Sequence, residues 1–363
     1  MELFEQMATM GHERVVVCSN PDIGLKAIIA VHSTVLGPGL GGCRMWPYES
    51  FDEALTDVLR LSRGMTYKAA VAGVNLGGGK AVIVGDSKKD KSEELLRAFG
   101  RYVESLQGVY ITAEDVGMRM QDMEVILAET RWVTGVSTDH GGSGDPSPVT
   151  AHGVHLGLKS ALKWKFGDDS AAGRVVAIQG LGSVGRYLAD YLIKEGAKVI
   201  GCDVDAEAVA RGREMGVEIV GVDEIAAVPC DVFSPCALGA SLNPDTIPKL
   251  ACQIVAGGAN NQLADEDRDG AALAARGILY APDYVINAGG LINVYNELLG
   301  YNRERALKMT RKIYDNLLAI FDTAQREKIS TQEAGDRLAE ARIERMSRLG
   351  SRQWTRLIDH RQL

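Results

Sequence analysis

The sequence predicts an α/β protein with two domains, an N-terminal α/β domain and a Rossmann-type domain built on a doubly wound parallel sheet. The chain has 363 residues, more than one hydrophobic core usually serves. Its first third mixes short apolar segments with amphipathic helical patterns. From Val175 onward, strand and helix patterns alternate regularly, which is typical of a parallel sheet covered by helices.

The first third predicts a mixed sheet packed against helices. Residues 15–18 and 26–32 are rich in β-forming residues and flank the turn sequence Asn20-Pro21-Asp22. The apolar positions then predict two helices and two buried strands, in the order 51–64 (helix), 81–85 (strand), 93–106 (helix) and 109–112 (strand).

The segment 139–148 is rich in glycine, serine and proline and predicts the crossing between the domains. A helix over 149–162 and the strands of the parallel sheet should follow, at 175–179, 198–203, 231–233, 253–256 and 277–280. The C-terminal part predicts a helix over 303–325 and another after Ser330-Thr331-Gln332-Glu333, which matches a capping box. We therefore expect domains over 1–138 and 139–330, with 331–363 packing back on the first.

Composition narrows the classes of partner. The net charge of −8, a pI near 5.4 and the absence of a basic block predict no nucleic-acid partner. We expect no membrane association, because there is neither an apolar run of about 20 residues nor a signal-peptide pattern. The six cysteines form no C-x-x-C pair, so we interpret them as reduced thiols of a cytoplasmic protein without a metal site.

The motif Gly180-Leu181-Gly182-Ser183-Val184-Gly185 follows an apolar strand and opens a helix, as a dinucleotide-binding loop requires. Gly180 permits a tight turn, Gly182 lets a pyrophosphate approach, and Gly185 lets helix and strand pack closely. Ser183 and Val184 begin the helix whose N-terminus faces the phosphate charge. Asp203 ends the next strand, where a carboxylate binds ribose hydroxyls and repels a 2′-phosphate. We therefore expect NAD rather than NADP as the cofactor.

A second set of polar residues lies in the first domain: Lys68 after a helical pattern, Lys80 after three glycines, and Asp115 after a strand. The glycines 77–79 carry no side chains, which we expect to leave space for a ligand. A Walker phosphate loop does not fit, because Ala81 follows Lys80. Such charges are often solvated, but these end apolar or glycine-rich segments. We therefore interpret them as a cation for a substrate carboxylate and a pair of acid/base groups.

At these residues the sequence resembles the glutamate/leucine/phenylalanine/valine dehydrogenase family, and most closely its leucine-active branch. The resemblance covers nearly the whole chain and includes residues 36–42, 60–68, 77–80, 111–117, 148–150, 235–240, 256–263 and 281–296. It implies reversible, NAD-dependent oxidative deamination of leucine, valine or isoleucine to the 2-oxo acid and ammonia. It also implies a homo-oligomer, assembled through a substrate-binding first domain and the C-terminal segment.

The resemblance implies a role for each candidate residue of the first domain. Lys68 would bind the substrate carboxylate, with help from the backbone around Gly41. Lys80 would polarise the carbonyl group and assist the reacting water molecule. Asp115 would be the general acid/base that carries protons to and from the substrate nitrogen.

The resemblance also extends to the cofactor side of the site. Thr150 matches the threonine that orients the nicotinamide, and Ala237 belongs to a cofactor-binding segment. Asn260 and Asn261 would contact the nicotinamide and the substrate, in an order that the sequence leaves open.

The family pattern places the side-chain pocket at Leu40, Ala113, Leu291 and Val294. Glutamate-active members carry a lysine at the position of Leu40 and a serine at that of Val294, so glutamate should be a very poor substrate here. The segments 46–48 and 293–296 are shared with members that act on larger side chains. Phenylalanine and tryptophan therefore remain alternative substrates.

Two other classes of protein compete with this interpretation. A non-catalytic NAD-sensing protein would have no evident need for both lysines and the aspartate. A hydroxy-acid or sugar dehydrogenase usually needs a catalytic histidine or a Tyr–Lys pair, and the six histidines lie in no such context. Turnover of amino acids with NAD would distinguish these classes.

Overall fold

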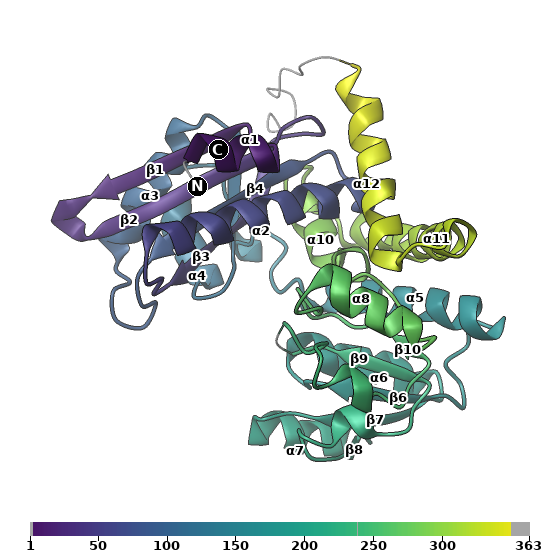
Figure 1. The fold of residues 1–363 in the computed structure, drawn as a ribbon. Helices are drawn as coiled ribbons and strands as arrows, with labels where there is room; N and C mark the ends of the chain where they lie inside the picture. The colour runs from purple at the N-terminus through teal and green to yellow at the C-terminus, as the bar shows by residue number, and fades with distance from the viewer. Residues whose placement is uncertain (1–2, 238, 350–363) are drawn as a thin grey trace. The chain divides into compact units, whose positions relative to one another are not determined.

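The computed structural model describes residues 3–237 and 239–349 of the chain. These residues form two compact units, each with its own sheet (Figure 1). Among the described residues, the first unit comprises 3–145, 294–303 and 339–349, and the second comprises 146–237, 239–293 and 304–338. The domain bounds expected at 138 and 331 stay a prediction. Leu238 lies outside the described residues. Residues 350–363, which form part of the expected C-terminal segment, lie outside them as well.

The first unit contains the mixed sheet that the sequence predicted. Its elements are α1 (Leu3–Met10), β1 (Arg14–Asn20), β2 (Leu25–Ser33), β3 (Gly39–Trp46), α2 (Phe51–Ala72), β4 (Gly77–Val84), α3 (Glu93–Ser105), β5 (Tyr110–Ala113) and α4 (Met120–Leu127). The strands lie in the order β1-β2-β4-β3-β5. Strand β2 is antiparallel to β1 and β4, whereas β3 is parallel to β4 and β5.

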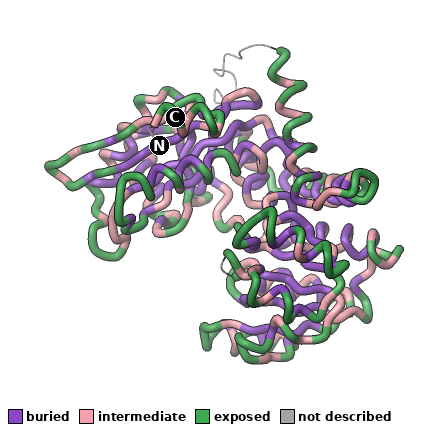
Figure 2. The backbone as a smooth tube through the Cα atoms, viewed as in Figure 1, coloured by how far each residue is buried: buried purple, intermediate pink, exposed green. Residues whose placement is uncertain are grey.

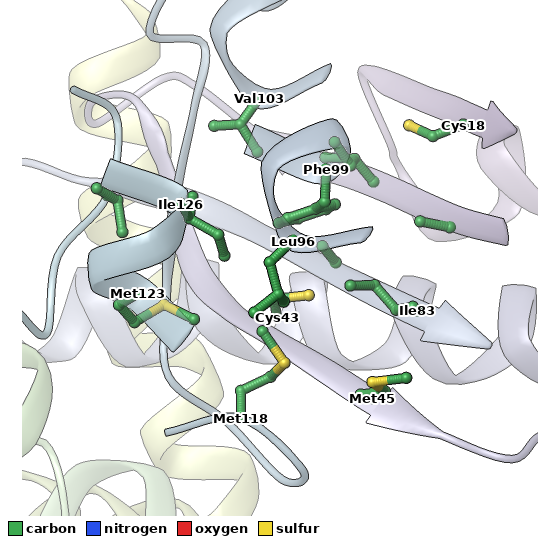
Figure 3. Packing of buried hydrophobic residues seen from close by; sticks show 14 of the residues in the cluster. Cys18, Cys43, Met45, Ile83, Leu96, Phe99, Val103, Met118, Met123 and Ile126 are labelled. Atoms are coloured by element: carbon green, nitrogen blue, oxygen red, sulfur yellow. The ribbon is translucent and has the colours of Figure 1, made fainter. Parts of the chain in front are cut away.

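Helices cover both faces of this sheet. On one face, Phe99 of α3 and Ile126 of α4 pack with Cys43 and Ile83 of the sheet (Figure 3). Helix α2 packs on the strands through a second cluster, which comprises Ile28, Ala30, Ala54, Leu55, Val58, Leu59 and Val82. Because neighbouring strand residues alternate between the two clusters, the clusters lie on opposite faces. Each large apolar side chain buried in this way contributes about 1.5–3 kcal/mol.

Strand β3 was not predicted from the sequence. Its start, Gly39-Leu40-Gly41-Gly42, contains three glycines, which disfavour a strand locally. Parallel pairing with β4 on one side and β5 on the other holds it in place. Helix α2 also runs past its predicted end at Gly64 to Ala72, where it is capped by Gly73 with a left-handed φ of 73°. Lys68 therefore lies within a helix.

The second unit contains the parallel, doubly wound sheet that the sequence predicted. Its elements, and the helices that follow, are α5 (Ser147–Phe166), β6 (Val175–Gln179), α6 (Ser183–Lys194), β7 (Lys198–Cys202), α7 (Ala206–Glu214), β8 (Glu218–Ile219), β9 (Val232–Pro235), β10 (Ile254–Val255), α8 (Glu266–Ala275), β11 (Leu279–Tyr280), α9 (Asp283–Ile286), α10 (Gly289–Glu297), α11 (Arg303–Glu327) and α12 (Thr331–Ser347). The strands lie in the order β11-β10-β9-β6-β7-β8, and all pairs are parallel. The strand order reverses between β6 and β9, and ligands of such sheets bind beyond the carboxyl ends of the strands at this point.

The predicted start of the last helix is confirmed. The Ser330 Oγ atom accepts a hydrogen bond of 3.0 Å from the Glu333 backbone N–H at the start of α12. The strands of both sheets are largely buried, whereas most helices expose one side (Figure 2). Within the described residues, no helix has both the length and the apolar character that crossing a membrane requires.

Candidate active site

The first unit brings two of the predicted site residues, Lys80 and Asp115, into direct contact. The Lys80 Nζ atom lies 2.7 Å from the Asp115 Oδ2 atom, and the Lys80 side chain is only 7% exposed. Lys80 lies in β4, and Asp115 follows the end of β5. Solvated surface charges would not be buried against each other in this way. The two residues therefore form a partly desolvated ion pair rather than separate surface charges.

A glycine permits the close approach of Asp115 to the sheet. A Cβ atom added at Gly42 would lie 2.8 Å from the Asp115 Cβ atom and 2.3 Å from the Glu114 carbonyl oxygen. Any side chain at this position would push the loop after β5 away from β3. The glycine-rich start of β3 therefore helps to shape the site.

Asp115 has a second cationic partner, Arg44, which the sequence analysis missed. The Arg44 Nε atom donates to the same Asp115 Oδ2 atom at 3.0 Å, and its Nη1 atom donates to Asp57 Oδ2 on α2 at 2.9 Å. The Tyr48 hydroxyl group donates a short hydrogen bond to the same Asp57 oxygen. Leu40, Gly42 and Arg44 are every second residue of β3, so their side chains lie on the same face of the sheet. Recognising β3 as a strand would therefore have placed Arg44 on the face of the site.

The charges around Asp115 keep its carboxylate ionised. Burial alone would raise the pKa of Asp115, but the positive charges of Lys80 and Arg44 more than offset this effect, and the net pKa is lowered. Burial raises the pKa of the neighbouring Cys43 thiol and of the Tyr110 hydroxyl, so both are neutral near pH 7. Asp115 is therefore a carboxylate that can accept a proton at neutral pH.

The prediction that the three glycines before Lys80 leave space for a ligand is wrong. They lie within β4, and Cβ atoms added to them would meet protein atoms: Ser33 O at 1.9 Å from Gly77, Thr66 Oγ1 at 2.2 Å from Gly78, and Tyr110 Cδ2 at 2.6 Å from Gly79. The chain itself occupies the space, because α2 and neighbouring strands pack onto the bare backbone of β4. The glycines thus permit close packing beside Lys80.

Two of the predicted pocket residues, Leu40 and Ala113, lie on the same face of the sheet as Lys80. The register pairs Ala113 with Gly42 and Leu40 with Gly78, and paired residues of parallel strands point to the same face. Lys80 follows Gly78 by two residues and so shares this face. Leu40 is 2% exposed and Ala113 is 8% exposed. Buried apolar side chains thus accompany the lysine–aspartate pair.

Other predicted substrate-binding residues lie on α2, β3 and α10, and their roles stay predictions. Lys68 is half-buried on α2. The Gly41 carbonyl group accepts a hydrogen bond of 2.7 Å from the Tyr110 hydroxyl group, so it is engaged within the sheet. Val294 and Leu291 both lie on α10, Val294 in the first unit and Leu291 in the second.

The glycine-rich loop between β6 and α6 in the second unit has the geometry of a phosphate-binding turn. Gly180 has a left-handed φ of 98°, and a Cβ atom added there would lie 2.8 Å from the Ala237 Cβ atom. A Cβ atom added at Gly185 would lie 2.0 Å from the Gly180 carbonyl oxygen, so α6 packs directly on the turn. No atom of the described chain lies within 4 Å of a Cβ added at Gly182, the N-cap of α6. The backbone at this residue is therefore open, as the close approach of a phosphate group requires.

Asp203 and the start of α6 both lie beside this loop. Ser183 and Val184 are the first residues of α6, where backbone N–H groups lack partners within the helix. The Asp203 Oδ2 atom accepts from the Leu181 N–H at 2.7 Å, and its Oδ1 atom accepts from the Asp205 N–H at 2.9 Å. These bonds fix a carboxylate beside the loop, as binding of ribose hydroxyls requires. The residues present therefore fit a dinucleotide.

Three more predicted residues of the second unit have defined partners or backbone geometry. The Thr150 Oγ1 atom donates to the Pro146 carbonyl oxygen at 3.0 Å within α5. The Asn260 Oδ1 atom accepts a hydrogen bond of 2.8 Å from the Asn287 Nδ2 atom. Asn287 is only 5% exposed, so a buried partner orients the Asn260 side chain. Asn261 has a left-handed φ of 50°, a conformation that asparagine tolerates better than most residues. The division of roles between Asn260 and Asn261 stays a prediction.

Comparison with known proteins gives matches along both units. Residues 12–132 match the family described as "Glu/Leu/Phe/Val dehydrogenase, dimerisation domain", and residues 141–210 and 204–349 match "Glutamate/Leucine/Phenylalanine/Valine dehydrogenase". The leucine dehydrogenase of Thermoactinomyces intermedius is 55% identical over 364 residues, covering 100% of this chain and 98% of that protein. The leucine dehydrogenase of Geobacillus stearothermophilus is 55% identical over 352 residues, covering 97% and 96%. The crystal structure of L-tryptophan dehydrogenase from Nostoc punctiforme matches with a TM-score of 0.85 and 46% identity, covering 95% of this chain and 100% of that chain.

Proposed function

Because the chain belongs to the glutamate/leucine/phenylalanine/valine dehydrogenase family, we propose that it catalyses the reversible, NAD-dependent oxidative deamination of leucine, valine and isoleucine. The observation that carries this proposal is the buried contact of 2.7 Å between Lys80 and Asp115. It provides an ammonium group and an ionised carboxylate on the sheet face that also carries Leu40 and Ala113. These are the groups that deamination of an apolar amino acid needs.

The overall reaction converts the amino acid, NAD and water into the 2-oxo acid, ammonium, reduced NAD and a proton. The α-hydrogen leaves the substrate as a hydride, with its electron pair, and the substrate becomes an imine. Water then adds to the imine carbon, and the bond between carbon and nitrogen breaks. The chain has to hold the substrate's α-carbon in place, exclude bulk water and move protons at nitrogen and oxygen.

Residues of the first unit divide these tasks. Asp115 accepts a proton from the substrate amino group before the hydride leaves, and it returns a proton to nitrogen after water has added, so that ammonia can depart. Lys80 polarises the bond between carbon and oxygen that forms when water adds. Lys68 provides a positive charge for the substrate carboxylate.

Residues of the second unit would hold the cofactor, which accepts the hydride when bound. The backbone of the loop from Gly180 to Gly185 and the start of α6 would bind the pyrophosphate. Asp203 would bind the ribose hydroxyls, and its negative charge favours NAD over NADP. Thr150, Ala237 and one of the two asparagines, Asn260 or Asn261, would lie near the nicotinamide.

The substrate preference follows from the apolar character of the proposed pocket. Burying an unpaired carboxylate against Leu40 would cost several kcal/mol, whereas burying an aliphatic side chain gains about 1.5–3 kcal/mol. Glutamate should therefore react far more slowly than leucine. The likeness to L-tryptophan dehydrogenase makes an aromatic amino acid the second candidate substrate, with the same mechanism.

The test is an absorbance assay of reduced nicotinamide with leucine, valine, phenylalanine, tryptophan and glutamate. We expect kcat/KM for leucine to exceed that for glutamate at least about 100-fold, the effect of a few kcal/mol. Lys80→Ala and Asp115→Asn should each lower kcat by about 100-fold or more, because each removes an acid/base or polarising group. Folded variants with near wild-type turnover would show that the mechanism is wrong. A preference for an aromatic substrate would correct only the size of the pocket.

We also propose that the protein works in the cytoplasm as a homo-oligomer. All six cysteines are free thiols, which suits a reducing compartment. The family part that matches residues 12–132 is described as a dimerisation domain. Light scattering coupled to size-exclusion chromatography would measure the number of subunits.

A further inference from the structure

We infer that Arg44 positions the Asp115 carboxylate for proton transfer, and that Asp57 and Tyr48 hold Arg44 in place for this task. The inference rests on the proposed function, because that proposal assigns to Asp115 the proton transfers at the substrate nitrogen. Arg44 touches no reacting atom in this scheme and is therefore a positioning residue. The four side chains form one polar chain, from Tyr48 through Asp57 and Arg44 to Asp115.

The two cations on Asp115 contact the same oxygen atom. Lys80 Nζ lies 2.7 Å from Oδ2, and Arg44 Nε lies 3.0 Å from it. Within the part of the chain that the structure describes, the other oxygen, Oδ1, has no hydrogen-bond partner. A carboxylate held at one oxygen by two donors presents the other oxygen in a fixed direction. Oδ1 is therefore the atom that exchanges the proton.

Arg44 can orient Asp115 because its own position is fixed at both ends. Its Nη1 atom donates to Asp57 on α2 at 2.9 Å, while Nε donates to Asp115. The guanidinium group is planar, so binding at two of its nitrogens sets the direction of both bonds. Tyr48 is 9% exposed, and its hydroxyl group fixes the Asp57 oxygen that Arg44 contacts. A lysine would reach only one of the two carboxylates at a time.

The charge of Arg44 also bears on when Asp115 takes up a proton. The groups that face Asp115 are Lys80 on β4, Arg44 and the Cys43 thiol on β3, and the Tyr110 hydroxyl on β5. The thiol and the hydroxyl are neutral near pH 7, so the two cations alone favour the ionised carboxylate. Without Arg44, Asp115 would bind a proton at higher pH and would stop acting as a base there.

A purely structural role for Arg44 predicts a different outcome. If Arg44 only ties α2 to the sheet, its loss lowers stability without moving the pH profile of the reaction. The two interpretations therefore predict different positions for the acid limb of the pH profile.

The test compares Arg44→Gln, Arg44→Lys and Asp57→Asn with a matched control, Arg101→Gln. Arg101 is 73% exposed and pairs with Glu129 in the same unit, so its variant should behave as the wild type. For Arg44→Gln we expect the acid limb of kcat/KM for leucine to move up by about one pH unit or more. We expect kcat to fall at least tenfold and KM to change by less than threefold, since the substrate is not contacted. Arg44→Lys should leave the acid limb of kcat/KM at its wild-type pH but should lower kcat. Asp57→Asn should also lower kcat, and it should not move the acid limb to higher pH.

A second measurement needs no turnover and separates this inference from the proposed function. The pKa of Asp115 is lower in the folded chain than in the unfolded chain, so the ionised carboxylate stabilises the fold at any pH above the unfolded pKa. This contribution is lost as pH falls through the folded pKa. In Arg44→Gln the folded pKa of Asp115 is higher, so this loss of stability should be smaller and complete at a higher pH, measured as the thermal midpoint against pH. An inactive wild type with this shift intact refutes the function alone. The role of Arg44 is overturned if Arg44→Gln and Arg101→Gln have the same dependence on pH, both of the thermal midpoint and of kcat/KM. If Arg44→Gln fails to fold, wild-type kcat in Arg44→Lys overturns it.

Discussion

Gly182 and Gly185 occupy the same loop, yet an added methyl group should affect them in opposite ways. At Gly185 the new Cβ would lie 2.0 Å from the Gly180 carbonyl oxygen, more than about 1 Å closer than an ordinary contact. The obstacle is backbone, so α6 or the turn must move. At Gly182 no described atom lies within 4 Å. The first substitution should damage the fold, and the second should damage cofactor binding.

The expected magnitudes follow from packing and helix propensity. Overpacking costs about 1–3 kcal/mol, and the preference of helices for alanine over glycine offsets up to about 1 kcal/mol. Gly185→Ala should therefore lose about 1–2 kcal/mol of stability, which lowers the thermal midpoint by about 3–6 °C. Gly182→Ala should change stability by less than about 1 kcal/mol, the effect of a weaker helix N-cap. Its affinity for NAD should fall at least about tenfold, because the methyl group occupies the space of the pyrophosphate.

Thermal unfolding without cofactor and calorimetric titration with NAD measure the two effects separately. Gly64→Ala is the matched control, since an added Cβ there also meets no atom within 4 Å and the residue is exposed on helix α2. It should gain up to about 1 kcal/mol and bind NAD as the wild type does. Wild-type NAD affinity in Gly182→Ala would refute the proposed position of the pyrophosphate. An unchanged midpoint in Gly185→Ala would refute the packing argument.

Two further predictions concern stability. Burial lowers the pKa of His12 and of His32 to about 4 each, against 6.5 in the unfolded chain, so the unfolded chain takes up protons that the folded chain cannot. The two histidines should therefore lower the thermal midpoint as pH falls from about 6.5 to 4. His12→Gln should weaken this dependence relative to the wild type, and an unchanged slope would contradict the assignment. Arg342 on α12 donates to the carbonyl groups of Ala69 and Ala70 in the last turn of α2 and of Val74 just after it. Arg342→Ala should cost about 2–3 kcal/mol, whereas exposed Arg345→Ala should cost little, and equal midpoints for the two variants would refute the role of Arg342.

The parts of the fold that the sequence predicted are those in which a long apolar period and its boundaries agree. The strand before the dinucleotide loop, the helix after the loop and the capped helix after Ser330 all combine a pattern with a local signal. Strand β3 lacked both, because three of its first four residues are glycine. Its conformation comes from pairing with strands on both sides, and such pairing is not encoded in the local sequence.

The site shows the same division between local and distant information. Lys80 and Asp115 could be proposed because each ends or begins a recognisable segment, and the structure brings them within 2.7 Å. Arg44 could not, because its role depends on contacts with Asp57 and Asp115, which lie on two other segments. An arginine among apolar residues has no distinctive spacing of its own. Only the fold shows that its guanidinium group joins a helix to the loop beside Lys80.

The same glycines explain why strand β3 was not predicted and how the candidate site is shaped. Gly42 disfavours a strand in isolation, yet any Cβ at this position would collide with the backbone at Glu114 and with the Asp115 side chain. Gly78 does the same for α2, since its bare backbone lies against Thr66 of the helix that carries Lys68. The site therefore requires glycine where a strand would prefer a β-branched residue, and the parallel pairing compensates for the lost local preference. Glycines that weaken a strand in this way thus mark a close approach of neighbouring backbone, and here that approach brings the loop of Asp115 up to Lys80.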